Sequence, residues 1–392
     1  MNNMKLREYL WGYLVAFIMI LLMQPGFMWG IDPFPIRILL ILILLINLDI
    51  HEDKQSLLLF FFFCVLSIYP VTHDNSLFGF IFFTTLAFIP FVKKRILSYS
   101  FLIFKKLLAY LTLVSLIMWI LVVVLGVNLP YTVVSPLNEL KDYDYRSYFF
   151  LLVPLKITDF DILKFNCIFD EPGVVGTYSL LMLISNNFNW KNKENWVFFL
   201  SGIVAFSFFF YLGLLLFALM NVFVSNVARK YKISAVFLSI AFIVAIQTIP
   251  LVNDMVGHRL EFDSSTGKLA GDNRSSEDLD SYISSIKGSY AYFFGDRDEI
   301  VEEYLANAGL NTAILRYGLV LIILYIVFFV MYSYYTSGKN RREAFLFMLA
   351  ILATIYQRPG LVNPPFIFMF VGIVINRAIK YNTSTLVSIN RC

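Results

Sequence analysis

The sequence predicts an all-α polytopic membrane protein with about 12 transmembrane helices and a large, partly helical external loop. The first reason is composition: 59% of the residues are hydrophobic, 41 of the 392 are Phe, and the mean hydropathy is +0.73. Soluble domains are only about 45–50% apolar, so the surplus must face a solvent other than water. The second reason is pattern, because apolar runs such as 38–48 and 107–127 lack the alternation of β-barrel strands.

Ten segments are apolar over a length close to the roughly 20 residues that a membrane-spanning helix needs. They are residues 10–29, 34–50, 55–72, 77–92, 107–128, 172–188, 233–250, 309–335, 344–357 and 363–380. Lys5 and Arg7 precede the first segment as in a signal peptide, but no small-x-small cleavage site follows it. We therefore expect the first segment to be a retained span.

Residues 195–226 form a further apolar segment that is long for one helix and short for two. Two lysines precede it and a basic cluster at 229–232 follows it. Because basic residues favour the cytoplasmic side, placing both clusters there requires the segment to cross twice, with a turn near 211–213. The total becomes twelve spans with both termini in the cytoplasm, and the basic clusters at 93–95 and 105–106 fall in cytoplasmic connections.

The whole chain, 1–392, is then a single transmembrane domain with two long external loops, at 129–171 and 251–308. The second loop carries five Lys/Arg and twelve Asp/Glu residues. Apolar residues recur at helical spacing between 279 and 286, which predicts an amphipathic helix. Ser275 and Asp278 form a candidate capping pair before this helix, and Gly288 can end it.

A second polar helix is predicted over 298–307. The large loop is therefore expected to be a folded cap on the external membrane surface, not a disordered tether.

Motifs that would indicate a nucleotide, metal or redox site do not occur. The sequence has no P-loop, GxGxxG, HExxH or CxxC pattern, only three histidines and three scattered cysteines. Asp-x-Asp triplets occur in acidic loops, where such spacing arises by chance. We therefore expect no metal and no cofactor.

Arginines are more informative, because several lie where the positive-inside rule disfavours them. Any one of them can be explained by a side chain that extends to the membrane interface. Together, however, they provide rigid bidentate donors suited to phosphate oxygens, and a lipid-linked diphosphate would be a natural ligand. The six expected at the external face are Arg37, Arg316 and Arg358 at span ends, and Arg259, Arg274 and Arg297 in the large loop.

Residues 164–177 precede and begin a predicted span. Pro172 suits the first turn of a helix, and Asp170 and Glu171 suit its positive end. This structural role explains the stretch, and the functional alternative makes Glu171 a general base or an anchor that orients an arginine. No predicted span has a charged residue near its middle, which disfavours an ion-coupled transporter.

Several stretches, in order, resemble the O-antigen polymerase (Wzy) family within the O-antigen polymerase and ligase superfamily. The element IFDEPGVVGT at 168–177 resembles the F-x-E-P-G signature of that superfamily. A double span with a polar turn follows, and the later matches are GDNRSS, YFFG, NAGLNTAILRYG and YQRPGLVNPP. The resemblance covers about residues 100–380, and Lys164 stands where the family usually has an arginine.

The resemblance implies a metal-independent, GT-C-like glycosyltransferase of the bacterial inner membrane whose active site faces the periplasm. Such enzymes transfer the growing glycan from undecaprenyl diphosphate to the terminal sugar of a lipid-linked repeat unit. The implied partners are the lipid-linked oligosaccharide, membrane lipids, a chain-length regulator and a flippase, with no nucleic acid.

On this reading, Glu171 is the first candidate for the general base, followed by Asp272 and His258. Arg274 and Arg259 are expected to bind the diphosphate, with support from Arg316, Arg358 and Lys164. The alternative within the superfamily is an O-antigen ligase, although ligases carry a histidine late in the large loop and His258 lies at its start. The alternative from another class is a flippase or transporter of lipid-linked sugars.

Overall fold

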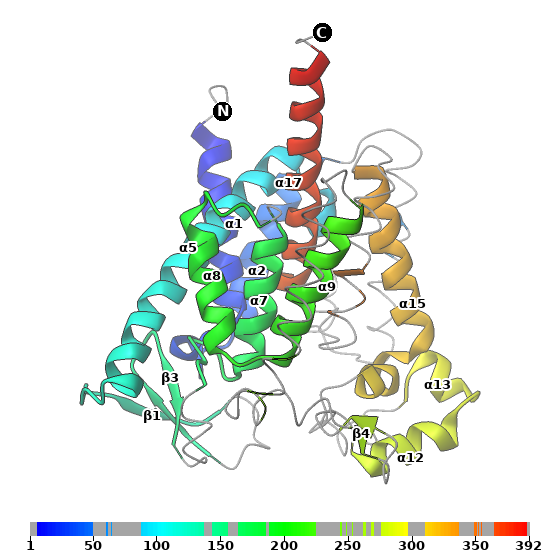
Figure 1. The fold of residues 1–392 in the computed structure, drawn as a ribbon. Coiled ribbons are helices and arrows are strands. Elements are labelled where there is room, and N and C mark those ends of the chain that lie inside the picture. The colour runs from blue at the N-terminus through cyan, green and yellow to red at the C-terminus, as the bar shows by residue number, and fades with distance from the viewer. Residues whose placement is uncertain are drawn as a thin grey trace.

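The computed structural model describes residues 6–49, 60–61, 64, 88–136, 143–155, 164–185, 188–224, 244, 248, 253, 262–263, 268–269, 276–296, 310–336, 349–350, 352, 354 and 364–389. This part of the chain is mostly helical (Figure 1). The helices of the first half are α1 (Leu6–Leu22), η1 (Gly26–Met28), α2 (Phe34–Ile46), η3 (Ile89–Phe91), α5 (Lys94–Trp119) and the π-helical η4 (Ile120–Val124). Those of the second half are α7 (Pro172–Ile184), α8 (Lys193–Val204), α9 (Phe208–Val224), α12 (Glu277–Ile286), α13 (Tyr290–Phe294), α15 (Leu310–Thr336) and α17 (Pro364–Ile389).

Two helices in the described residues are long and apolar enough to cross a membrane: Lys94–Val124, of 31 residues, and Leu310–Thr336, of 27. Predicted spans 10–29, 34–50, 172–188, 309–335 and 363–380 coincide with α1, α2, α7, α15 and α17. Spans 55–72, 77–92, 233–250 and 344–357 lie wholly or mostly outside the described residues, so the count of twelve stays a prediction.

The segment 195–226 forms two helices, as the charge pattern predicts, but the break is not where we expected it. It lies at 205–207, where Phe206 has φ +48°, instead of near 211–213. Ser179 of α7 bonds Ser201 of α8 over 3.0 Å, while a Cβ at Gly213 of α9 would collide with Leu180 of α7. Gly213 therefore serves close helix packing and not a turn.

Helix α5 begins at Lys94, earlier than the predicted 107, so the expected cytoplasmic position of Lys105 in a connection is wrong. Lys105 is buried, and its Nζ donates to Met182 O at 3.0 Å, Asn195 Oδ1 at 3.0 Å and Ser185 Oγ at 3.2 Å. The ammonium of Lys105 thus joins α5 to α7, to Ser185 at the end of α7, and to α8 through charge-assisted hydrogen bonds. The statement that no predicted span has a charged residue near its middle does not hold for the longer helix Lys94–Val124, and the partners of Lys105 explain why its charge is tolerated.

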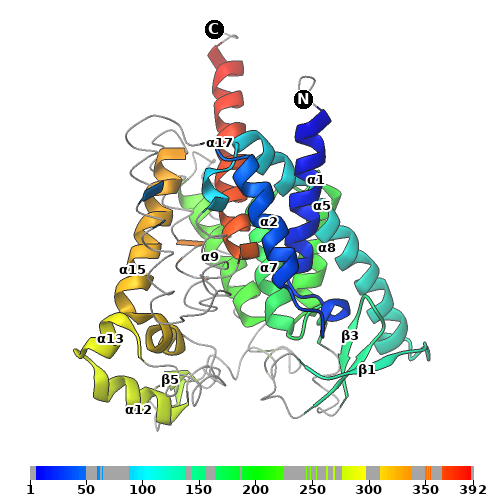
Figure 2. The ribbon, with the colours of Figure 1, turned by 180° about the vertical axis from the view of Figure 1, so that it is seen from behind.

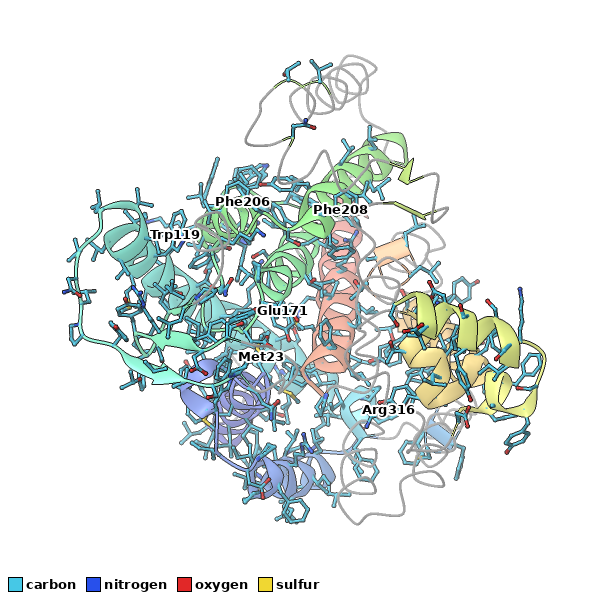
Figure 3. The ribbon with its side chains drawn as sticks, turned by 90° about the horizontal axis from the view of Figure 1, so that it is seen from below. Met23, Trp119, Glu171, Phe206, Phe208 and Arg316 are labelled. Carbon is cyan, nitrogen blue, oxygen red and sulfur yellow. The ribbon has the colours of Figure 1, made fainter. Side chains whose placement is uncertain are left out.

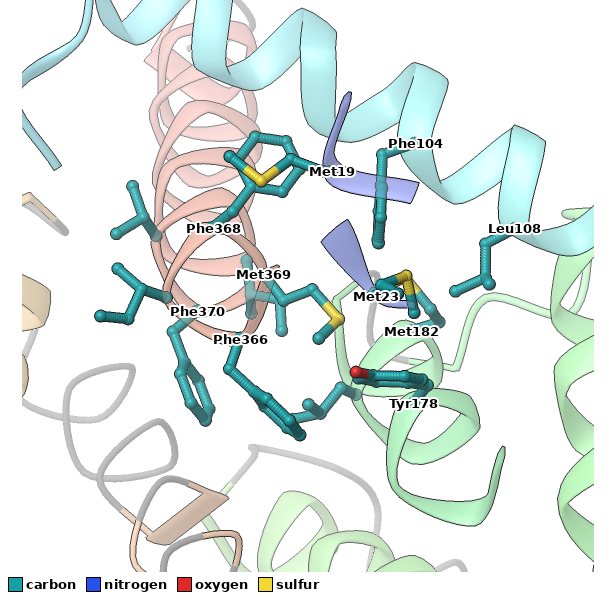
Figure 4. Packing of buried hydrophobic residues seen from close by; sticks show 14 of the residues in the cluster. Met19, Met23, Phe104, Leu108, Tyr178, Met182, Phe366, Phe368, Met369 and Phe370 are labelled. Carbon is teal, nitrogen blue, oxygen red and sulfur yellow. The ribbon is translucent and has the colours of Figure 1, made fainter. Parts of the chain in front are cut away.

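The core lies where α1, α5, α7 and α17 meet (Figure 4). Phe104 of α5 contacts Phe368 of α17 edge-on, with ring centroids 5.4 Å apart, and Tyr178 of α7 lies 5.3 Å from Phe366. A Cβ at Gly372 would collide with the ring of Phe101. Large rings thus pack closely against small residues in this centre.

Two small antiparallel sheets make the all-α prediction incomplete. One is β1 (Thr132–Val134), β2 (Tyr145–Ser147) and β3 (Leu152–Pro154), in that order. The other pairs β4 (Phe262–Asp263) with β5 (Lys268–Leu269). Both sheets, with α12 and α13, lie at one end of the molecule, whereas α1 begins and α17 ends at the other (Figures 1 and 2). The described parts of the two predicted external loops therefore share an end opposite the termini.

Candidate functional site

The loop before α7 is a buried element of the fold. Phe165, Asn166, Cys167, Ile168 and Phe169 are all at most 3% exposed. Its backbone is hydrogen-bonded to three other elements: Gly26 N donates to Ile168 O at 2.7 Å, Leu152 N to Cys167 O at 2.8 Å, and Phe165 N to Val204 O at 3.1 Å. Residues from η1, β3 and the end of α8 therefore fix the approach to α7.

Tyr145, in the central strand of the three-stranded sheet, anchors Asp170, the residue before the N-cap Glu171. It is fully buried, and its hydroxyl donates to Asp170 O at 2.6 Å. Burial raises the pKa of Tyr145 far above its usual value, and the neighbouring Tyr143, Asp170 and Glu171 add to the shift. The phenol therefore stays protonated and remains a donor at any ordinary pH. The edge of Trp29 packs against its ring.

Cys167 and Asn166 lie at the base of the loop against α5. Cys167 has φ +57°, a left-handed conformation that is strained for a residue with a side chain. Burial raises the pKa of its thiol to about 11, so the sulfur is a neutral packing group. Asn166 Oδ1 is buried and has no hydrogen-bond partner among the described residues.

Glu171 is the N-cap residue of α7, as the position of Pro172 predicts. Its backbone is extended (φ −141°, ψ 136°), and its half-buried side chain makes no capping hydrogen bond to the described backbone of α7. The carboxylate thus sits in the positive field of the helix start without serving as its cap.

The second part of the candidate site is the cap, which we define as α12 and α13. The predicted amphipathic helix is confirmed as α12, with Leu279 fully buried and Ile283 nearly so. The N-cap residue of α12 is Ser276, one residue later than the expected Ser275. Its Oγ accepts a hydrogen bond from Leu279 N at 3.1 Å. Gly288 ends it with φ +88°, as predicted.

The cap docks on the start of α15 through backbone contacts that only glycine allows. Gly318 has φ +77° and kinks α15, and a Cβ there would collide with the backbone of Phe293 and Phe294. Asp296 N donates to Leu315 O at 2.8 Å. Between the two helices, Asn311 Nδ2 of α15 donates to Asp280 Oδ1 of α12 at 2.6 Å and closes the contact.

Arg316 lies on this docked turn of α15 and is exposed, with its guanidinium 5.5 Å from the ring centroid of Tyr317. Figure 3 shows Glu171 near the middle of this end of the molecule and Arg316 on the cap side, with α17 between them in that view. The structure therefore brings the two to the same end but not into contact. Lys164 lies half-buried at the start of the Glu171 loop.

The other predicted site residues, Arg259, Arg274 and Arg358, lie outside the described residues, as do Asp272, His258 and the expected helix 298–307. In the described residues, Arg37 lies near the start of α2. No group of three or more His, Cys, Asp or Glu side chains in these described ranges is arranged to hold a metal ion.

Sequence reasoning missed Tyr145 because it assigned no strands to the first loop. The available signal was alternation: Tyr145 and Ser147 are buried while Arg146 between them is exposed, which is the period of a strand. No family model, curated protein or solved structure matches this chain.

Proposed function

We propose that the protein is a surface-polysaccharide (O-antigen) polymerase of the bacterial inner membrane, with twelve spans and a GT-C-like organisation. The observation that carries the proposal is Glu171: a half-buried carboxylate at the start of α7, on a buried loop at the same end of the molecule as α12 and α13 (Figure 1). The resemblance of 168–177 to the superfamily signature and the two membrane-length helices support it.

The reaction joins two lipid-linked glycans on the periplasmic side. A hydroxyl of the terminal sugar of the incoming unit attacks the anomeric carbon of the growing chain. A new glycosidic bond forms as the bond to undecaprenyl diphosphate breaks, and the diphosphate leaves with the bonding electrons. Glu171 accepts the hydroxyl proton.

Cations lower the barrier by stabilising the charge that develops on the leaving diphosphate. Arg316, exposed on the first turns of α15, is the described candidate for this role. Arg259, Arg274, Arg358 and Lys164 are the further candidates. Loss of one such group is expected to cost about 10²–10³-fold in rate.

The test is polymerisation in vitro with the purified chain and its lipid-linked repeat unit, without divalent metal or nucleotide sugar. Glu171→Gln should lower the rate by about 10²–10⁴-fold, the usual contribution of a general base. Asp170→Asn removes the neighbouring carboxylate and is the matched control, expected within a few-fold of the native rate. A Glu171→Gln protein that polymerises normally would disprove the role of this residue.

The same assay separates the alternatives. A ligase requires a lipid A core acceptor and makes no product from repeat units alone, and a flippase forms no new glycosidic bond. The buried Lys105 does not favour transport, because three acceptors hold its ammonium in place.

A further inference from the structure

An apolar pocket of about 270 Å³ lies between α7, α9 and the residues Leu349, Ala350, Leu352 and Thr354. Leu180, Leu181 and Ile184 of α7 form one wall, and α9 forms another from Phe209 to Phe217. A close-packed interior has few voids larger than a water molecule, so a space of this size is more than a packing defect.

The described lining residues offer water almost no hydrogen-bond donors or acceptors. Its one polar side chain is Thr354, whose hydroxyl donates to Ala350 O at 2.7 Å. A cavity lined by Leu, Ile and Phe stays dry, and one of only about 150 Å³ binds benzene. The pocket therefore suits a hydrocarbon ligand.

The pocket opens between helices instead of being sealed. Leu216 and Leu352 line it and are also exposed to solvent. A flexible hydrocarbon chain can enter through such an apolar mouth without removing any charged group from water.

Helix α7 relates this pocket to the candidate site. Close contacts at Gly176 with Ser207 and at Gly213 with Leu180 hold α7 against the start of α9. Leu180 and Gly213 also line the pocket. Leu180 is nine residues after Glu171, or about 14 Å along a helix.

We propose that this pocket holds part of the isoprenoid chain of the lipid carrier whose diphosphate end lies near Glu171. The proposal rests on the proposed function for the identity of that lipid. One helix, α7, then positions the reacting end of the substrate at its start and the hydrocarbon chain toward its end.

Binding of farnesyl diphosphate to the detergent-purified full chain, measured by native mass spectrometry, tests the proposal. Ala350→Phe fills the pocket and should weaken binding at least about tenfold. Leu212→Phe enlarges an exposed side chain of α9 that does not line the pocket, and should bind within about twofold of native. Inorganic diphosphate, which lacks the chain, should not compete at equal concentration.

Native-level binding by Ala350→Phe, or displacement by an equal concentration of phosphatidylglycerol, would overturn the proposal. If Ala350→Phe does not fold, a photoreactive farnesyl diphosphate on the native chain replaces it. Labelling of 209–217 or 349–354 supports the pocket, and labelling only elsewhere refutes it. The binding assay is independent of the polymerisation assay. Selective binding that is lost in Ala350→Phe, without any polymer product, supports the pocket and rejects the polymerase. Polymer product together with native-level binding by Ala350→Phe supports the polymerase and rejects the pocket.

Discussion

The loop that carries Glu171 and the cap formed by α12 and α13 occupy the same end of the molecule but are built differently. The loop is buried, and its backbone bonds to η1, to β3 and to the end of α8. The cap is a small amphipathic unit whose described contacts run mainly to the first turns of α15. A residue held from several directions keeps its geometry when one contact is lost, whereas a unit docked on one helix depends on that contact. We infer that the loop is the fixed floor of the site and the cap its separable lid.

Gly318→Ala is expected to have the largest effect, because it should destabilise the docked cap and leave the Glu171 loop intact. The substitution forces a side chain into φ +77° and against the backbone of Phe293 and Phe294, at a cost of about 2–5 kcal/mol. Gly30→Ala is the matched control, with φ +81° and no atom within 4 Å, and should cost about 1–2 kcal/mol.

In this experiment, one probe reports on the cap and a second probe reports on the loop that carries Glu171. Trypsin cleavage after the exposed Lys287 should become faster in Gly318→Ala, because the cap undocks. Alkylation of Cys167, followed by mass spectrometry, should stay as slow as in the native chain because the thiol is buried. Faster alkylation of Cys167 would mean that loop and cap unfold as one unit, and the contrast would be wrong.

Tyr145→Phe tests the fixed floor with a smaller change. Loss of the 2.6 Å bond to Asp170 O should cost about 1 kcal/mol of stability. Because Glu171 follows Asp170, kcat for polymerisation should fall about tenfold with little change in KM.

Because the raised pKa keeps Tyr145 protonated, the defect should be the same at every pH of the neutral range. A defect that varied with pH would mean that Tyr145 transfers a proton instead of positioning the loop. Tyr131→Phe, on the exposed side of the sheet, is the control and should leave kcat unchanged.

The smallest effect is expected at Ser276, which caps α12. Ser276→Ala removes the acceptor of Leu279 N and should destabilise the cap by about 1 kcal/mol, measured by cleavage after Lys287. Ser284→Ala, on the exposed face of the same helix, should be neutral or slightly stabilising, since Ala is the better helix former. Equal effects from both variants would show that the N-cap hydrogen bond of Ser276 does not stabilise α12.

Elements governed by local chemistry were predictable from the sequence. Helix α12 follows from apolar spacing and its terminal residues, and the start of α7 follows from Pro172. Features set by distant partners were not predictable. Gly213 is predicted from the sequence to lie in a turn, but its missing Cβ makes room for Leu180 of α7.

The candidate site follows the same rule. Glu171 is recognisable because its motif is contiguous, whereas Tyr145 is connected to it only through the fold, across 25 residues of sequence. The alternation of Tyr145, Arg146 and Ser147 covers only three residues, which is too short a run to predict the sheet that supplies Tyr145.

Lys105 has a consequence for the order in which the chain is assembled. The acceptors on Met182, Ser185 and Asn195 follow it by 77, 80 and 90 residues, so α5 is synthesised well before these partners. In the proposed membrane setting, a lysine without partners at a helix centre costs about 2.5–3.5 kcal/mol on insertion. We therefore expect the insertion of α5 to become more favourable once α7 and α8 have been made.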